Sequence, residues 1–367
     1  CTNQKTETPW EEVQQHLIEK NSEIVKIKKK LKNNREEYLK TYTRIEEIMV
    51  MREMDQARPT YLYNRGVYSE PLYTVEAKVP AALPAMDESL PKNRLGLSQW
   101  LFDPKNPLTA RVAVNRYWQM IFGQGLVGTP NDFGVQGQLP SHPELLDWLA
   151  IRFRQNWDVR ALIKEMVLSK TYQQQSVSNE LLDQKDPNNI LLARANVSRL
   201  PAEIIRDNAL KVSGLLNPKF GGKSVMPYQP DGLWKEKNNF STFLYEYEQS
   251  AGDDLYRRGL YTFIRMTSPP PNMMTFDATS REVCTVKRDV TSTPLQALVL
   301  LNDPQFFEAS RVFAERMIKN KDRLEDQIRF GFRLATSRYP KQEELEILVD
   351  LYNNQYDFFR KNRDKAY

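Results

Sequence analysis

Only two histidines, His16 and His142, are available for acid–base chemistry in this chain, so a zinc site of three histidines is excluded and we predict no metal site. The order Ser141-His142-Pro-Glu144 predicts a helix start with Ser141 as its cap. A helix N-terminus favours neutral imidazole, which beside Asp132 and Ser141 could act as a general base. His142 and Asp132 are therefore candidate catalytic residues. The alternative is a histidine that bonds only within the capping turn.

A second group of side chains shares one face of a helix predicted from Ala110 to Phe122, with spacings of i, i+4, i+7 and i+11. These residues are Arg111, Asn115, Trp118 and Phe122. An arginine fork and an asparagine beside aromatic rings could hold a carboxylate or a sugar ring, because arginine binds anions and rings stack on pyranose faces. The alternative is an internal network in which the arginine is paired structurally.

A third group lies in the segment from Phe276 to Asn302, in a loop that precedes a predicted helix start. Its members are Asp277, Arg281, Cys284, Lys287 and Arg288. Such a cluster could bind an anion, with Arg281 also a candidate catalytic residue, and a thiol beside basic groups could be reactive. The alternative is a packed loop that contains a buried, inert thiol.

The sequence lacks the motifs of several well-known classes of enzyme and cofactor site. Formylglycine sulfatases need Cys or Ser, then x-Pro-x-Arg, and the nearest match, Ser292 to Gln296, ends in glutamine. The chain has neither a glycine-rich phosphate loop nor a C-x-x-C-H haem attachment site. A net charge of +5 over 367 residues is too small to indicate nucleic acid. No run of about 18 apolar residues predicts a membrane span.

The first fifty residues are expected to form one long helix or a helical hairpin. Thr8-Pro9 begins the pattern, a narrow apolar stripe predicts a coiled-coil-like seam, and Asn33-Asn34 is the expected hinge. This segment could dock a partner or act as a spacer. Residues 51–92 contain repeated prolines and predict an extended strap, with short strands as an option.

Residues 93–367 predict a mainly helical domain with a loop and hairpin region at about 215–290. Helix signals there include a Gly123 stop and the break at Asn302-Asp303-Pro304. Phe243 to Glu248 and Leu260 to Met266 alternate with the two-residue period of strands, which predicts a β-hairpin. The expected fold class is therefore mainly α, with a small β-hairpin insertion.

Long stretches of the sequence resemble a known family. They are NRLGLSQWLFDPKNPLTARVAVNRYWQMIFGQGLV (93–127), TPNDFGVQGQLPSHPELLDWLA (129–150), YQPDGLW (228–234) and the segment 276–302. They are similar to the C-terminal domain of planctomycete-type envelope proteins known as domain of unknown function 1553. MVMREM (49–54) fits the start of the family pattern, and the resemblance covers about residues 49 to 360.

The resemblance implies a cellular context rather than a reaction. Family members usually follow a second uncharacterised domain, and many carry a c-type cytochrome domain and a lectin-like sandwich. They occur in bacterial envelopes, often near sulfatase or polysaccharide-degradation genes, and have no established catalytic residues. Because this chain has no haem motif, haem c would belong to a companion domain or chain. Cys1 could be the lipid-carrying first residue of an envelope lipoprotein, or simply where this sequence begins.

Two functions follow as hypotheses. The first is a non-catalytic structural or ligand-binding module of a larger extracytoplasmic protein, contacting its other domains, envelope partners or carbohydrate. The second is an enzyme domain that acts on complex carbohydrate, including sulfated forms, with haem supplied from another domain or chain. A shared cleft lined by Arg111, Asp132, His142, Arg281 and Arg288 would favour an enzyme or ligand site, and separate packed networks would count against it.

Overall fold

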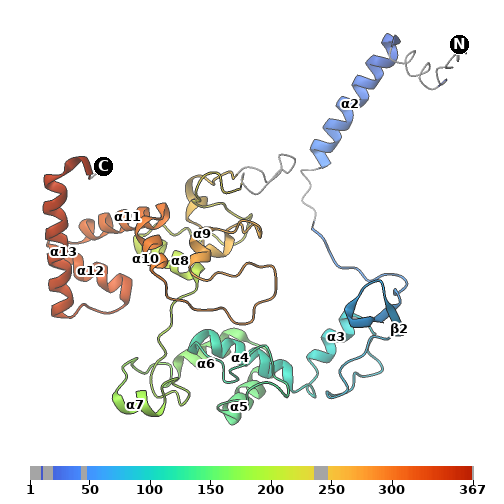
Figure 1. Ribbon diagram of the computed structural model, residues 1–367, viewed down its shortest axis with the longest axis horizontal. Coiled ribbons are helices and arrows are strands. Elements are labelled where there is room, and N and C mark those ends of the chain that lie inside the picture. Colours follow the sequence, from blue (N-terminus) through green and yellow to red (C-terminus); the bar gives the residue numbers. More distant parts are fainter. Residues whose placement is uncertain (1–9, 11–19, 43–47, 235–246, 366–367) are drawn as a thin grey trace, which may run out of the picture. The chain divides into compact units, whose positions relative to one another are not determined.

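The computed structural model describes residues 10, 20–42, 48–234 and 247–365. Within these ranges the chain forms twelve α-helices, several short 3-10 turns and one two-stranded antiparallel sheet (Figure 1). This confirms the prediction of a mainly helical fold. The chain divides into two compact units, Cys1–Leu101 and Phe102–Tyr367. No helix of the described part combines the length and the apolar character that a membrane crossing needs.

The longest element of the first unit is α2, Ser22–Tyr42. The side chain of Asn21 begins it by accepting hydrogen bonds from the backbone N–H groups of Glu23 and Ile24. The helix runs unbroken through Asn33-Asn34, so the predicted hinge is wrong. Two asparagines cost only about 1 kcal/mol in helix propensity, and the lysines, glutamates and leucines around them favour the helix. Much of the predicted 9–50 helix lies outside the described residues, and its coiled-coil seam stays a prediction.

The sheet lies within the proline-containing segment. Strands β1, Thr60–Tyr63, and β2, Pro71–Val75, pair antiparallel with Thr60 opposite Val75. The predicted hairpin at 243–266 is not found: 243–246 lie outside the described residues, and 260–266 contain the 3-10 turn Gly259–Tyr261 and isolated bridges. The 3-10 turn Gly259–Tyr261 packs against helix α8, where a Cβ on Gly259 would lie 3.1 Å from the backbone of Glu203.

Helix α3, Arg94–Leu101, ends the first unit and packs against the segment that precedes it. The indole Nε1 of Trp100 donates to the carbonyl of Pro84 over 2.8 Å. A Cβ on Gly96 would stand only 1.9 Å from the carbonyl oxygen of Pro91, so the close approach of the two segments requires glycine there.

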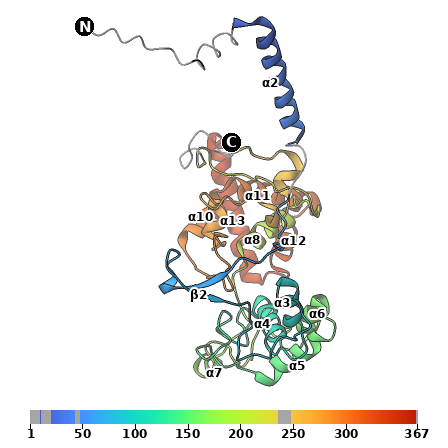
Figure 2. The same ribbon diagram turned by 90° about the vertical axis from the view of Figure 1, so that its right-hand side faces the viewer.

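Three helices of the second unit share one hydrophobic core. They are α4, Leu108–Phe122; α5, Pro143–Arg154; and α6, Val159–Leu168. Figures 1 and 2 show them gathered together. Gly123 ends α4 with φ of 80°, a left-handed value that glycine adopts readily. The Asp158 side chain begins α6 by accepting from the Ala161 N–H.

The remaining helices pack mainly around α8 and α11. Helix α8 contacts α11 and α9. Helix α12 contacts both α11 and α13. Prolines begin α9, α10 and α11, as their fixed φ allows at a first helical position. The bounds are α7, Glu180–Lys185; α8, Ala202–Ser213; α9, Pro271–Thr275; α10, Pro294–Asn302; α11, Pro304–Asn320; α12, Leu324–Thr336; and α13, Gln342–Lys361.

Candidate functional site

The predicted base, His142, stands at the N-cap position of α5, one residue later than the predicted cap Ser141. The predicted capping box is wrong, because no side chain caps this helix. Pro143 has no N–H to offer, and the Ser141 hydroxyl lies 3.0 Å from Nδ1 of His142 instead. Asp132 accepts from the N–H of Gly134 over 2.7 Å, within its own loop. No hydrogen bond or ion pair joins Asp132 to His142 in the described structure.

The predicted binding face of α4 separates into three different environments. Nε of Arg111 pairs with Oδ1 of Asp147 at 2.6 Å, and this hydrogen bond lowers the pKa of Asp147. Asn115 is fully buried and exchanges two hydrogen bonds with the backbone of Val127. Trp118 is buried and stacks on Phe122 with ring centroids 3.9 Å apart. Arg111 and Asn115 therefore hold neighbouring segments in place.

Two members of the predicted anion cluster, Asp277 and Arg288, are paired with other residues of the chain. Asp277 accepts hydrogen bonds from the N–H and hydroxyl of Thr291 and pairs with Arg199. The backbone hydrogen bond from Thr291 is the main reason that the pKa of Asp277 is lowered.

Beside it, Arg288 grips Glu203 through both Nη atoms, at 2.7 and 3.1 Å. Burial alone would raise the pKa of Glu203, but the bonds from Arg288, aided by the charge of Arg281, lower it. The thiol of Cys284 is free and exposed, so the alternative of a buried thiol is wrong. The arginines and Asp277 thus fasten residues 276–291 to the start of α8.

The five residues whose shared cleft would have favoured an enzyme or ligand site do not form one network. Arg111 pairs with α5, Asp132 and His142 bond within their own loops, and Arg281 and Arg288 act on Glu203. The described residues also contain no group of three or more His, Cys, Asp or Glu side chains that could hold a metal ion.

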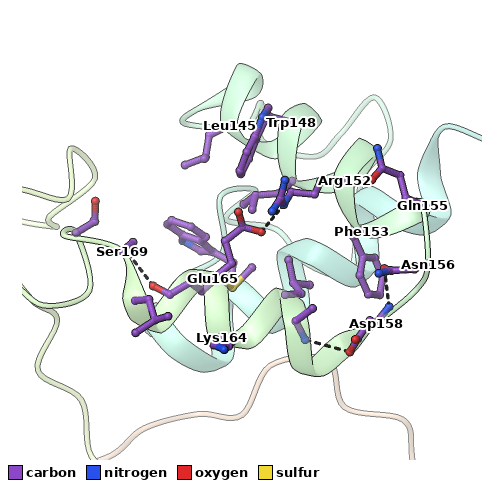
Figure 3. Close-up of a pocket in the computed structure, with 17 residues that line it drawn as sticks. Leu145, Trp148, Arg152, Phe153, Gln155, Asn156, Asp158, Lys164, Glu165 and Ser169 are labelled. Carbon is purple, nitrogen blue, oxygen red and sulfur yellow. Dashed lines mark hydrogen bonds and ion pairs between the residues drawn. The ribbon is translucent and has the colours of Figure 1, made fainter.

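A different hollow offers a binding site, and we call it the α5–α6 pocket. It has a volume of about 770 Å³, which lies in the range of small-molecule sites. In Figure 3 most of its labelled side chains arise from α5, α6 and the turn between them, and Trp118 of α4 also lines it. The lining residues used below are Leu145, Trp148, Arg152, Asn156, Lys164 and Glu165.

Three of these side chains form the polar and aromatic centre of the pocket. Nε of Arg152 donates to Oε2 of Glu165 over 2.7 Å, and the two point toward one another in Figure 3. The guanidinium carbon of Arg152 also lies 5.5 Å from the ring centroid of Trp148. The Trp148 side chain is 51% exposed, whereas Trp118 at the base of the pocket is 5% exposed. A half-exposed indole beside a planar cation is suited to stacking on a ligand ring.

The unpaired charged groups of the pocket are cationic. Glu165 is engaged by Arg152, and Asp158 accepts from the helix N–H of Ala161. Arg152 bonds to Glu165 through Nε alone, so its two Nη groups remain as donors. Within the described chain no carboxylate pairs with Lys164. The donors left over therefore favour a negatively charged ligand.

The helical pattern of α5 contains a signal for this site. Leu146, Leu149, Ala150 and Phe153 form the buried stripe. Leu145, Trp148 and Arg152 follow at i, i+3 and i+7 on a neighbouring stripe that leaves the core. None of these three residues was among the predicted site residues, although their spacing was visible in the sequence.

Comparison with known proteins places most of the chain in a family of unknown activity. The family model named PSD1 and described as protein of unknown function (DUF1553) matches residues 93–352. No curated protein and no solved structure matches the chain.

Proposed function

The chain belongs to the PSD1 (DUF1553) family of proteins of unknown function, and for this chain we propose a role in binding rather than transforming a ligand. We propose that the ligand is an anionic glycan. The matched region contains both helices of the α5–α6 pocket. The observation that carries the proposal is the half-exposed Trp148 beside Arg152, whose Nη donors remain unpaired.

The ligand class follows from the groups in the pocket. An indole face stacks on the apolar face of a sugar ring, and a guanidinium fork binds carboxylate or sulfate with two hydrogen bonds. Asn156 and Gln155 lie at the same wall and could bond sugar hydroxyls. A uronic acid or a sulfated sugar offers both the ring and the anion in one residue.

A binding role also agrees with the positions of the candidate catalytic residues. His142 bonds to Ser141, Asp132 bonds within its own loop, and Arg281 acts on Glu203. General acid–base catalysis needs such groups within hydrogen-bond reach of one reacting atom. The proposal extends the expectation of an extracytoplasmic module in a larger protein, with other domains or chains supplying any haem c.

Affinity electrophoresis tests the proposal on the intact chain. Gels containing dextran sulfate or polygalacturonate should retard the protein, and gels containing neutral dextran should do so much less. Trp148→Ala and Arg152→Ala should each weaken retention by about tenfold, whereas Trp148→Phe should keep part of it. Arg160→Ala is the matched control, because Arg160 is exposed on α6 and does not line the pocket.

Two results would overturn the proposal. Retention by neither acidic polysaccharide would exclude an anionic glycan of this type. Equal losses in Arg152→Ala and Arg160→Ala would show that only net charge matters. Release of products from either polysaccharide, lost in His142→Ala, would instead support the enzyme hypothesis.

A further inference from the structure

A second hollow, which Trp118 also lines, has a different chemical character. Its volume is about 400 Å³, and Trp118 lines both cavities. No charged side chain lines this second cavity. We call it the carboxamide pocket, and the residues used below are Phe122, Gln124, Gln138, Asn188, Ile190 and Asn196.

Four carboxamides of this pocket have unused hydrogen-bonding capacity. The side chains of Gln124, Gln138, Asn188 and Asn196 are exposed and make no hydrogen bond within the described structure. Their neighbour Asn189 differs, because its amide exchanges two bonds with the backbone of Arg194 and shapes the loop. The wall therefore has one structural amide and four that remain available to a ligand.

Two glycines allow these amides to lie close against the backbone. A Cβ on Gly128 would stand 2.2 Å from Oε1 of Gln138, and a Cβ on Gly123 would stand 2.0 Å from Nδ2 of Asn196. Both amides thus lie over bare glycine backbone, where a larger residue would displace them. The floor beneath them is apolar, with Phe122 stacked on Trp118.

We propose that the carboxamide pocket binds a neutral saccharide residue. Each carboxamide both donates and accepts, as neighbouring sugar hydroxyls do, so amide and diol can form paired hydrogen bonds. The aromatic floor can pack against the C–H face of the ring. A phosphate, sulfate or carboxylate would find no cation here, which separates this pocket from the α5–α6 pocket.

This inference deepens the proposed function and rests on it for the ligand class. A polysaccharide that alternates acidic and neutral residues would present one of each to the two cavities beside Trp118. The two sites differ in the charge of their ligands, so each can be measured without the other.

Saturation-transfer NMR on the intact chain tests the inference with neutral oligosaccharides of glucose, mannose, galactose and xylose. At least one should give a signal that Gln138→Ala weakens by about fivefold, the loss expected for one or two hydrogen bonds. Gly128→Ala should weaken it similarly, because the added methyl displaces the flexible Gln138 amide. Gln136→Ala is the control, since Gln136 is an exposed neighbour outside the pocket.

The outcomes separate this inference from the proposed function. Retention by dextran sulfate should be unchanged in Gln138→Ala and Gly128→Ala. A neutral signal that depends on Gln138, without any retention by acidic polysaccharides, would sink the proposed function and keep the neutral site. Absence of a signal from all four neutral sugars, or a signal lost in Trp148→Ala but kept in Gln138→Ala, would overturn the inference.

Discussion

Arg152 and Glu165 join α5 to α6 through one hydrogen bond, in which Nε donates to Oε2 over 2.7 Å. Their side chains are 59% and 32% exposed. Ion pairs at this exposure contribute about 0–1 kcal/mol to stability, because water screens both charges. The pair therefore matters less for the fold than for ligand binding, since Glu165 competes with any anion for the same guanidinium.

Removing that competition should strengthen binding. In Glu165→Gln the guanidinium of Arg152 is released from its carboxylate, and the affinity for dextran sulfate should rise by about two- to fivefold. Affinity electrophoresis at several polysaccharide concentrations measures the change. Glu144→Gln, an exposed change in the first turn of α5, removes the same charge outside the pocket and serves as the control. Weaker binding by Glu165→Gln would mean that Glu165 itself contacts the ligand.

A second prediction concerns the buried amide of α4. Asn115 is fully buried, accepts from the N–H of Val127 over 2.8 Å and donates to its carbonyl over 3.1 Å. Asn115→Ala leaves both backbone groups without partners and should lower the free energy of unfolding by about 2–4 kcal/mol. Urea unfolding followed by tryptophan fluorescence measures this loss. Asn131→Ala, at an exposed position in the next loop, should change stability by less than about 0.5 kcal/mol.

Local signals in the sequence predicted many element ends correctly. Gly123 ends α4, and Asp303-Pro304 separates α10 from α11, because their effects depend on the backbone of a few residues. The strand prediction at 260–266 failed for a physical reason. A two-residue alternation of residue types does not require a strand: Leu260 and Met266 at its two ends are 59% and 55% exposed, and within the described residues the segment makes only isolated bridges.

The partners of the charged residues could not be predicted in the same way. Asp277 and Arg288 were identified as candidate ligand groups, but they pair with Arg199 and Glu203, 78 and 85 positions away in the sequence. Residue type shows that a charge needs a partner, and only tertiary packing shows whether the partner is internal. The Arg152–Glu165 pair was missed for the same reason, because it depends on how α5 crosses α6.

A third prediction concerns Arg206 on α8, which is 2% exposed. It donates to the carbonyls of Leu255 and Arg257 and to Oε1 of Gln305, and burial lowers its pKa to about 10. Arg206→Lys keeps the charge but loses the planar fork, so the free energy of unfolding should fall by about 2–4 kcal/mol. Urea unfolding measures this, and hydrogen exchange should show faster exchange in residues 252–262. Arg258→Lys, at a half-exposed position, is the control. Full rescue by lysine would show that the charge alone is needed.

The last prediction is a pH dependence set by Glu203. Its folded-state pKa is lowered from 4.5, because the bonds from Arg288 outweigh burial. A lowered carboxyl pKa contributes stability above the unfolded value, and that stability is lost as the pH falls through the folded value. Glu203→Gln should therefore reduce the free energy of unfolding by about 1–3 kcal/mol at neutral pH, with the difference shrinking below about pH 4. Melting temperatures of both proteins across this range measure the effect, with Glu282→Gln in the exposed part of the same loop as the control. A difference that stays constant as the pH falls would show that hydrogen bonding or packing, rather than the charge of Glu203, fastens residues 276–291 to α8.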